Sequence, residues 1–231
     1  MNTDTLTRMM ESAHAPFDFS GPYANVYRNR AMCIDERHVH TIFDVLMAGR
    51  FKSACELGSF DGASTVAFVE AHNRGNLERF IACDVMLSQS LSSVLANRNS
   101  PRVSYTNTKS WELLAREGDA FEYDCIFVDA NHDLESVTKE LDQILKRLPR
   151  CIMAHDTNAT RMGYPAAEGA AHLADTIRKH PAYRGKCLED AVVRDGEETH
   201  RGLFFATTDQ ELYGHARAIF AHRCPILEGV A

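Results

Sequence analysis

The feature that most constrains the fold is a short apolar run without any polar alternation. Residues 123–130 read YDCIFVDA, in which Cys, Ile, Phe and Val follow one another between two acids. A strand with one face in water alternates apolar and polar residues, whereas an unbroken run suits a parallel strand that is buried on both faces. Residues 150–156 (RCIMAHD) repeat the pattern, and residues 79–85 (RFIACDV) form another such run with an acid near its end. These runs predict a buried, mostly parallel sheet.

Segments with helical spacing of apolar residues lie between the predicted strands. Further short strands are expected at residues 51–57, 103–108 and 202–208, and helices at residues 36–50, 64–73, 87–98, 110–117, 134–148 and 165–180. Asp133 is expected to cap the helix that starts near residue 134. Strand–helix alternation repeated this often predicts one α/β domain.

The composition excludes several classes of protein. Of 231 residues, 45% are hydrophobic and 25% are charged, as in an ordinary globular protein. The formal net charge of −7 provides no basic field for nucleic acid or an anionic membrane, so neither partner is expected. No apolar stretch reaches the ~20 residues that span a bilayer, and the N-terminus lacks the apolar core of a signal peptide.

The cysteines indicate a reducing compartment. Their number is odd, seven, and no CxxC pair occurs. Four of them, Cys55, Cys83, Cys125 and Cys151, fall within or beside apolar runs and are expected to be buried core residues. We therefore expect a cytoplasmic protein without a disulfide framework.

A glycine turn follows the first predicted strand. Residues 56–62 read ELGSFDG, and ligands of open α/β sheets bind beyond the carboxyl ends of the strands. Gly58 and Gly62 permit a tight turn and a close approach of backbone to ligand. The spacing is neither GxGxxG nor a P-loop, so a phosphate-dominated ligand fits poorly. Asp84 ends the next strand, where a carboxylate can hold a ribose diol. The pattern indicates an adenosine ligand such as S-adenosylmethionine (SAM).

These motifs together resemble a known family. ELGSFDG, the strand-end acid in IACD, and VDANHD are similar to the class I SAM-dependent methyltransferases, over about residues 36–160. The later AHDT and Gly163-Tyr164-Pro165 look most like the small O-methyltransferases of natural-product and sugar hydroxyls. The resemblance implies a Rossmann-like, doubly wound α/β fold with a mostly parallel seven-stranded sheet and helices on both faces.

The resemblance also implies a single domain, residues 1–231, in which three segments have different roles. Residues 1–35 would be an N-terminal arm or cap, residues 36–160 the cofactor-binding core, and residues 161–231 the substrate-side helices and last strands. The cofactor-binding residues implied in this way are Glu56, Gly58, Ser59, Gly62, Asp84, Ser110, Trp111 and Asp129. Glu56 and the glycines would lie at the methionine end of SAM, Asp84 at the ribose, and Ser110 with Trp111 at the adenine.

Relatives of this kind place a divalent metal beside the methyl group. Asp129, His155 and Asp156 occupy the corresponding positions, although His155 departs from the all-oxygen set that Mg²⁺ prefers. Three options stay open: Asp129 and Asp156 with waters, a softer metal such as Mn²⁺, or no metal. A metal would lower the pKa of the acceptor hydroxyl, and without one His132 or His155 would act as the general base.

The expected activity is transfer of a methyl group from SAM to a small hydroxylated metabolite or natural product. Two other classes are open on the sequence alone. A nicotinamide-dependent oxidoreductase could use a similar sheet, although the missing GxGxxG counts against it, and a non-catalytic protein could keep the adenosyl pocket. The oligomeric state is open on the sequence alone, and a homodimer is one option because relatives often pair.

Overall fold

The chain folds around one seven-stranded sheet. The computed structural model describes residues 19, 23, 24, 26, 33–116, 123–158, 168–194 and 197–223. The strands follow the order β3-β2-β1-β4-β5-β7-β6, and all neighbours are parallel except β7, which runs antiparallel to both β5 and β6. Their bounds are β1 Phe51–Leu57, β2 Leu77–Asp84, β3 Val103–Asn107, β4 Cys125–Val128, β5 Cys151–His155, β6 Cys187–Arg194 and β7 Glu197–Thr207. The predicted fold class is confirmed.

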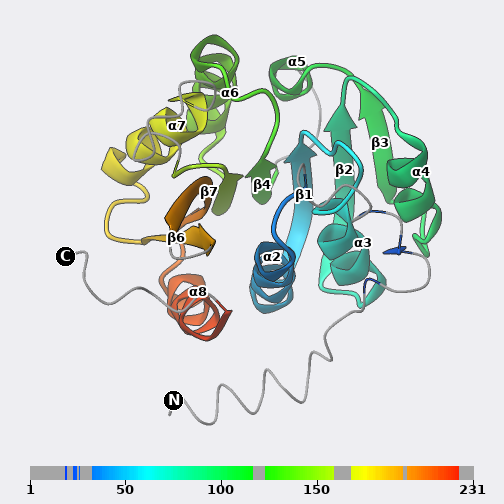
Figure 1. Ribbon diagram of the computed structural model, residues 1–231, viewed down its shortest axis with the longest axis horizontal. Helices are drawn as coiled ribbons and strands as arrows, with labels where there is room; N and C mark the ends of the chain where they lie inside the picture. The colour runs from blue at the N-terminus through cyan, green and yellow to red at the C-terminus, as the bar shows by residue number, and fades with distance from the viewer. Residues whose placement is uncertain are drawn as a thin grey trace.

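Helices cover both faces of the sheet (Figure 1). One core contains side chains of α2 (Glu36–Gly49), α3 (Thr65–Asn73), α4 (Gln89–Ala96) and α8 (Gln210–Arg223). The core on the opposite face contains side chains of α5 (Ser110–Ala115), α6 (Leu134–Arg147) and α7 (Glu168–Lys179). The domain is therefore a three-layer α/β/α sandwich.

The unbroken apolar runs follow from these two cores. In β4, Cys125 and Phe127 pack into the first core, whereas Ile126 and Val128 pack into the second. Successive side chains of a strand point to opposite faces, so a strand covered on both sides needs an apolar residue at every position. The same alternation holds in β5.

Local sequence signals set the ends of the elements. The side chain of Asp133 accepts a hydrogen bond of 2.9 Å from the backbone N–H of Ser136, which confirms it as the cap of α6. Lys146 and Arg147 lie in the last turn of this helix, where positive charge complements the helix dipole.

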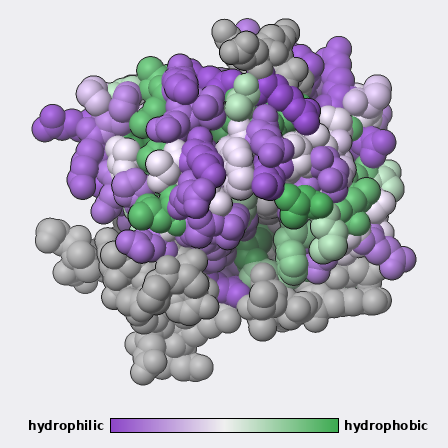
Figure 2. All heavy atoms as spheres, turned by 90° about the horizontal axis from the view of Figure 1, so that it is seen from above, coloured by the Kyte–Doolittle hydropathy of each residue, from purple (hydrophilic) through white to green (hydrophobic). Residues whose placement is uncertain are grey.

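The burial of the cysteines and the hydropathy of the surface follow the expectations from the sequence. The four cysteines expected in the core are buried. The face of the molecule seen in Figure 2 is mostly hydrophilic with smaller apolar areas. Within the described ranges, no helix combines the length and the apolar character needed to cross a membrane.

The structure differs from the sequence prediction at the far edge of the sheet. Strand β6 (CLEDAVVR) was not predicted, and β7 begins at Glu197, five residues before the predicted segment. β6 is an edge strand, so it carries polar residues that hide the pattern of a buried strand. Almost all of the predicted arm, and Gly163-Tyr164-Pro165, lie outside the described residues.

Candidate active site

A cavity of about 890 Å³ opens at the carboxyl ends of the parallel strands. The chain runs from β1 outward to β3 and then from β4 outward to β5, so the order of the strands reverses between β1 and β4. Ligands of doubly wound sheets bind at this reversal. Nine of the residues predicted from the sequence line the cavity: Gly58, Ser59, Asp84, Ser110, Trp111, Asp129, His132, His155 and Asp156.

The glycine turn closes one side of the cavity. Gly58 and Gly62 have φ angles of 86° and 89°, in the region that favours glycine. A Cβ atom at Gly58 would lie 2.2 Å from the backbone oxygen of Asp129, so this glycine permits close contact between two strand ends. At Gly62 a Cβ would meet Leu91 of α4 at 3.2 Å. The glycines thus serve chain packing; Gly62 is not among the residues that line the cavity, and its predicted contact with a cofactor stays a prediction.

Glu56 lies beneath the turn and not in the cavity wall. Its carboxylate accepts hydrogen bonds from the hydroxyls of Ser59 (3.0 Å), Ser64 (2.6 Å) and Thr65 (2.6 Å). Burial raises the pKa of this carboxyl to about 7, although the three hydroxyls oppose the shift. The bonds make Glu56 a support of the turn, and its contact with the methionine end of a cofactor stays a prediction.

Asp84 ends β2 and faces the turn. Its Oδ2 accepts hydrogen bonds from the backbone N–H groups of Ser59 (3.0 Å) and Phe60 (2.8 Å), and its Oδ1 accepts one from Met86 (3.1 Å). A carboxylate has about four acceptor sites, so roughly one remains for a ligand. Asp84 therefore shapes the turn before any ribose arrives, and its role in binding ribose stays a prediction.

Ser110 and Trp111 open α5 on the far wall. The hydroxyl of Ser110 donates to the buried carboxyl of Glu140. The nitrogens of Lys109 and Lys139 lie 5.3 and 5.1 Å from the centre of the Trp111 ring, within the range of cation–π contacts. Trp111 is thus held as a wall of the cavity, and adenine contact stays a prediction.

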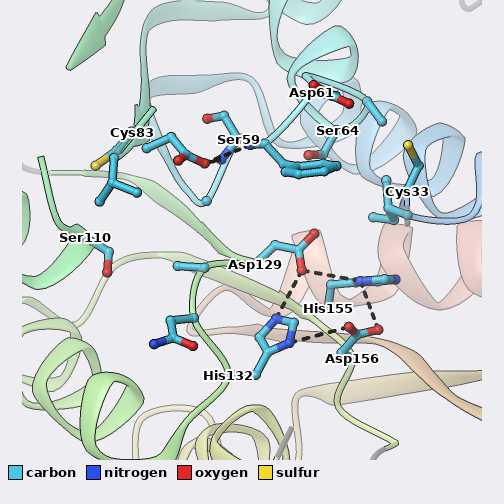
Figure 3. A pocket seen from close by; sticks show the side chains of 18 of the residues that line it. Cys33, Ser59, Asp61, Ser64, Cys83, Ser110, Asp129, His132, His155 and Asp156 are labelled. Atoms are coloured by element: carbon cyan, nitrogen blue, oxygen red, sulfur yellow. Dashed lines mark hydrogen bonds and ion pairs between the residues drawn. The ribbon is translucent and has the colours of Figure 1, made fainter. Parts of the chain in front are cut away.

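Two carboxylates and two imidazoles meet at the other end of the cavity, beyond β4 and β5 (Figure 3). His132 lies between the carboxylates, with Nε2 3.3 Å from Oδ1 of Asp129 and Nδ1 3.5 Å from Oδ2 of Asp156. The Nδ1 atom of His155 is 3.4 Å from Oδ1 of Asp129 and 3.2 Å from Oδ1 of Asp156. Asp156 has a φ of 57°, an uncommon backbone conformation outside glycine. We call these four residues the acid–histidine cluster.

Electrostatics couple the members of this cluster. Burial alone would raise the pKa of Asp129, but the neighbouring imidazoles outweigh it and lower that pKa. Burial would lower the pKa of both His132 and His155, yet the carboxylates outweigh burial and raise both values. The cluster therefore stabilises imidazolium beside carboxylate, which is the state that follows uptake of a proton by a histidine.

Several lining residues were not found from the sequence. Cys33, Ile34, Asp61, Lys109 and Arg201 also face the cavity. Asp61 lies within the glycine turn, which was a usable signal. The others come from segments without a recognisable motif, and their position depends on the tertiary fold.

Comparison with known proteins agrees with this geometry. Residues 55–157, which contain the glycine turn and the acid–histidine cluster, match the family model described as a methyltransferase domain. The chain thus contains a methyltransferase domain over these residues. No sequence among the curated proteins matches it significantly.

Solved structures share the fold of this methyltransferase. An O-methyltransferase from Bacillus cereus in complex with S-adenosylhomocysteine (SAH) is 16% identical, with a TM-score of 0.61 over 89% of this chain and 100% of that one. TomG, an O-methyltransferase of tomaymycin synthesis from Streptomyces achromogenes in complex with SAM, is 16% identical, with a TM-score of 0.59 over 89% and 96%. The N-methyltransferase NodS from Bradyrhizobium japonicum is 17% identical, with a TM-score of 0.52 over 78% and 98%. At such identities the likeness establishes the fold.

Proposed function

We propose that this methyltransferase moves the methyl group of SAM to a hydroxyl oxygen of a small metabolite or natural product. One observation carries the proposal: a single cavity has the glycine turn with Asp84 at one end and the acid–histidine cluster at the other. The first end suits an adenosyl ligand with few phosphates, and the second suits a group that loses a proton. Two of the similar structures contain SAM or SAH.

The reaction is an in-line displacement at the methyl carbon. An acceptor hydroxyl is a weak nucleophile until its proton is removed, and a positioned base contributes about 10²–10⁴-fold to such a step. His132 is the residue we assign to receive this proton, because its side chain is 21% exposed and lines the cavity. Asp129 faces Nε2 of this ring and Asp156 faces Nδ1, so one of these two contacts would open for a nitrogen to reach the hydroxyl, and the carboxylates would then stabilise the imidazolium that forms.

His155 has a different place in this scheme. Its side chain is only 4% exposed, and its Nδ1 points to the two carboxylates. We therefore assign His155 as a positioning residue for Asp129 and Asp156, and the catalytic role predicted for it passes to His132.

A divalent metal is the finer part of the proposal. The sequence predicted Asp129, His155 and Asp156 as its ligands, but it is Asp129, His132 and Asp156 that each offer one donor atom within 4.8 Å of one another, so we propose His132 in place of His155. A mixed oxygen and nitrogen set suits Mn²⁺ better than Mg²⁺. When bound, such a metal would occupy the lone pair of His132 and take the place of this base, acting as a Lewis acid that lowers the pKa of the acceptor hydroxyl.

Calorimetry tests the cofactor assignment first. SAH is titrated into the full-length protein, alone and with Mg²⁺ or Mn²⁺, and NAD⁺ is the control. Saturable binding of SAH with no heat from NAD⁺ supports the proposal. Binding of NAD⁺ in place of SAH would favour an oxidoreductase and overturn it.

An acceptor screen then tests the chemistry. The protein is incubated with isotopically methyl-labelled SAM and with matched pairs of small phenols, sugars and amines that differ only in the accepting group. Labelled products from hydroxyl compounds alone support O-methylation. Labelled amines alone would overturn it, and SAH binding without any labelled product would indicate a non-catalytic binding protein.

A further inference from the structure

The first turn of α2 meets the end of β5 beside the cavity. Asp35, the residue before α2, His38 within its first turn, and His155 at the end of β5 each offer one donor atom, and these atoms lie within 4.8 Å of one another. This set comes from segments more than 115 residues apart in sequence. His155 belongs both to this set and to the acid–histidine cluster.

His38 is held in a state suited to a metal ligand. Its ring is fully buried, and Nε2 lies 2.8 Å from Oδ2 of Asp190, which Arg37 contacts in turn. A histidine that gives one N–H to a carboxylate presents a lone pair at the other nitrogen. That nitrogen, Nδ1, is buried and has no hydrogen-bond partner among the residues that the structure describes.

His155 shows the same arrangement with the roles of its two ring nitrogens exchanged. Its Nδ1 faces Asp129 and Asp156, and its Nε2 is buried and has no hydrogen-bond partner within the described part of the chain. Figure 3 shows one edge of this imidazole turned to the two carboxylates and the opposite edge directed away from them. The rings of His38 and His155 meet edge to face, with their centres 5.6 Å apart.

We propose that Asp35, His38 and His155 form a binding site for a nitrogen-preferring divalent metal of the Zn²⁺ type, with water at the remaining position. Metal-binding histidines almost always give their other ring nitrogen to a carboxylate or carbonyl, and both histidines here do so. Two imidazoles with one carboxylate is a known ligand set for Zn²⁺. Donor atoms on one tetrahedral Zn²⁺ lie ~3.3 Å apart, so only small movements of side chains are needed to close this set.

The local charge also favours a divalent cation. Arg201 lies 3.3 Å from Oδ2 of Asp35, which by itself would repel a metal. Around the two histidines, however, four carboxylates outnumber two guanidinium groups: Asp35, Asp129, Asp156 and Asp190 against Arg37 and Arg201. Binding of a metal would displace the proton of His155, and with both imidazoles neutral the surplus of two negative charges equals the charge of one divalent ion.

The site has access to solvent and a consequence for the fold. His155, Arg201 and Ile34 line the cavity, so a metal can enter from there. A metal at this place would tie the start of α2 to the end of β5 and fix the ring of His155. The inference concerns binding alone, and it can hold or fail independently of methyl transfer.

The test is a titration of the metal-free full-length protein with Co²⁺ alone, without SAM. Binding at a site with imidazole ligands produces visible d–d absorption, and Zn²⁺ is then used to displace the Co²⁺. The variants are His38→Gln and Asp35→Asn, which remove ligands, and Asp190→Asn, which removes the carboxylate behind His38. His40→Gln, two residues further along α2, is the matched control, and His132→Gln reports on the acid–histidine cluster.

The expected result is one Co²⁺ that persists in His132→Gln and is displaced by Zn²⁺, whereas a second Co²⁺ that is lost in His132→Gln would belong to the acid–histidine cluster. Affinity should fall at least ~100-fold in His38→Gln and Asp35→Asn and ~10- to 100-fold in Asp190→Asn, the range known for carboxylates behind metal ligands. The His40→Gln protein should bind as the wild type does. Circular dichroism and thermal melts show which variants are folded, and Asp35→Asn decides the matter where His38→Gln does not fold. Absence of Co²⁺ binding, or binding lost in His132→Gln but kept in His38→Gln, would overturn the proposal.

Discussion

The two ends of the cavity are built by different means. At the glycine turn, the carboxylates of Glu56 and Asp84 accept hydrogen bonds from hydroxyls and backbone N–H groups of the same turn. At the acid–histidine cluster, Asp129 and Asp156 face the rings of His132 and His155, which can carry charge. Fixed dipoles thus stabilise the carboxylates at the glycine turn, whereas imidazole rings that gain and lose protons stabilise those of the acid–histidine cluster.

This difference indicates which end binds and which end reacts. Backbone dipoles cost little reorganisation and preserve the shape of a turn, which suits recognition of a cofactor. Side chains with shifted pKa values in a cleft are typical of sites that move protons. Substitutions at the two ends should therefore alter different measurements.

The largest effect is expected for Asp129→Asn. Loss of this charge leaves His132 without its main anionic partner, so turnover should fall at least ~100-fold, while SAH affinity should change less than ~10-fold. Turnover is measured with the acceptor found by screening, and SAH affinity by calorimetry. Asp142→Asn, on the exposed side of α6, is the control. Equal losses in turnover and SAH affinity would contradict the separation of the two ends.

Glu56→Gln should change how stability depends on pH. The pKa of Glu56 is about 7 in the folded state against a reference value of 4.5, so the folded state holds a proton that the unfolded state has lost. Stability supplied by this group is therefore complete at low pH and decreases as pH rises through 7, by up to about 3 kcal/mol. Urea unfolding from pH 5 to pH 8 should show this loss in the wild type and a smaller one in the variant. Parallel curves would contradict the shifted pKa.

Asp84→Ala should weaken SAH binding with little effect on the chemical step. The variant loses charge-assisted hydrogen bonds worth about 1.5–3 kcal/mol, or about 10- to 150-fold in affinity. Glu78→Ala is the matched control, because Glu78 is an exposed acid near the start of the same strand. Unchanged affinity would remove Asp84 from the cofactor end and leave it as a support of the turn.

The smallest effect is expected for Trp111→Ala. Loss of an aromatic wall should cost about 0.5–1.5 kcal/mol of binding free energy, or about 2- to 12-fold in affinity. SAH and adenosine should weaken equally if this wall contacts adenine. An effect on SAH with none on adenosine would place Trp111 elsewhere in the cavity.

Much of this molecule could be predicted from local sequence. The apolar runs at β4 and β5 indicate strands that are buried on both faces. The glycines at positions 58 and 62 indicate backbone angles that other residues rarely adopt. Acids that follow parallel strands could be predicted to lie close together, because parallel strands end at the same edge of the sheet. That geometry explains why Asp129 and Asp156 were expected to be neighbours.

The remainder depends on contacts between distant segments. Asp190 lies in the unpredicted edge strand β6, and it reaches His38 across 152 positions of sequence. A histidine within an amphipathic helix is indistinguishable in sequence from an ordinary core residue. The support role of Glu56 was also hidden, because the three hydroxyls that bind it follow at offsets of three, eight and nine residues without a recognisable motif.

The contact at Gly58 has a consequence for engineering this enzyme. A Cβ there would stand 2.2 Å from the backbone oxygen of Asp129, so the backbone of the glycine turn packs directly against the backbone that carries the acid–histidine cluster. The spacing between the glycine turn and the acid–histidine cluster is therefore set by backbone contact, and it cannot be adjusted by another side chain at position 58. Libraries that seek new acceptors should leave this residue fixed and vary lining residues outside the predicted cofactor set, such as Ile34.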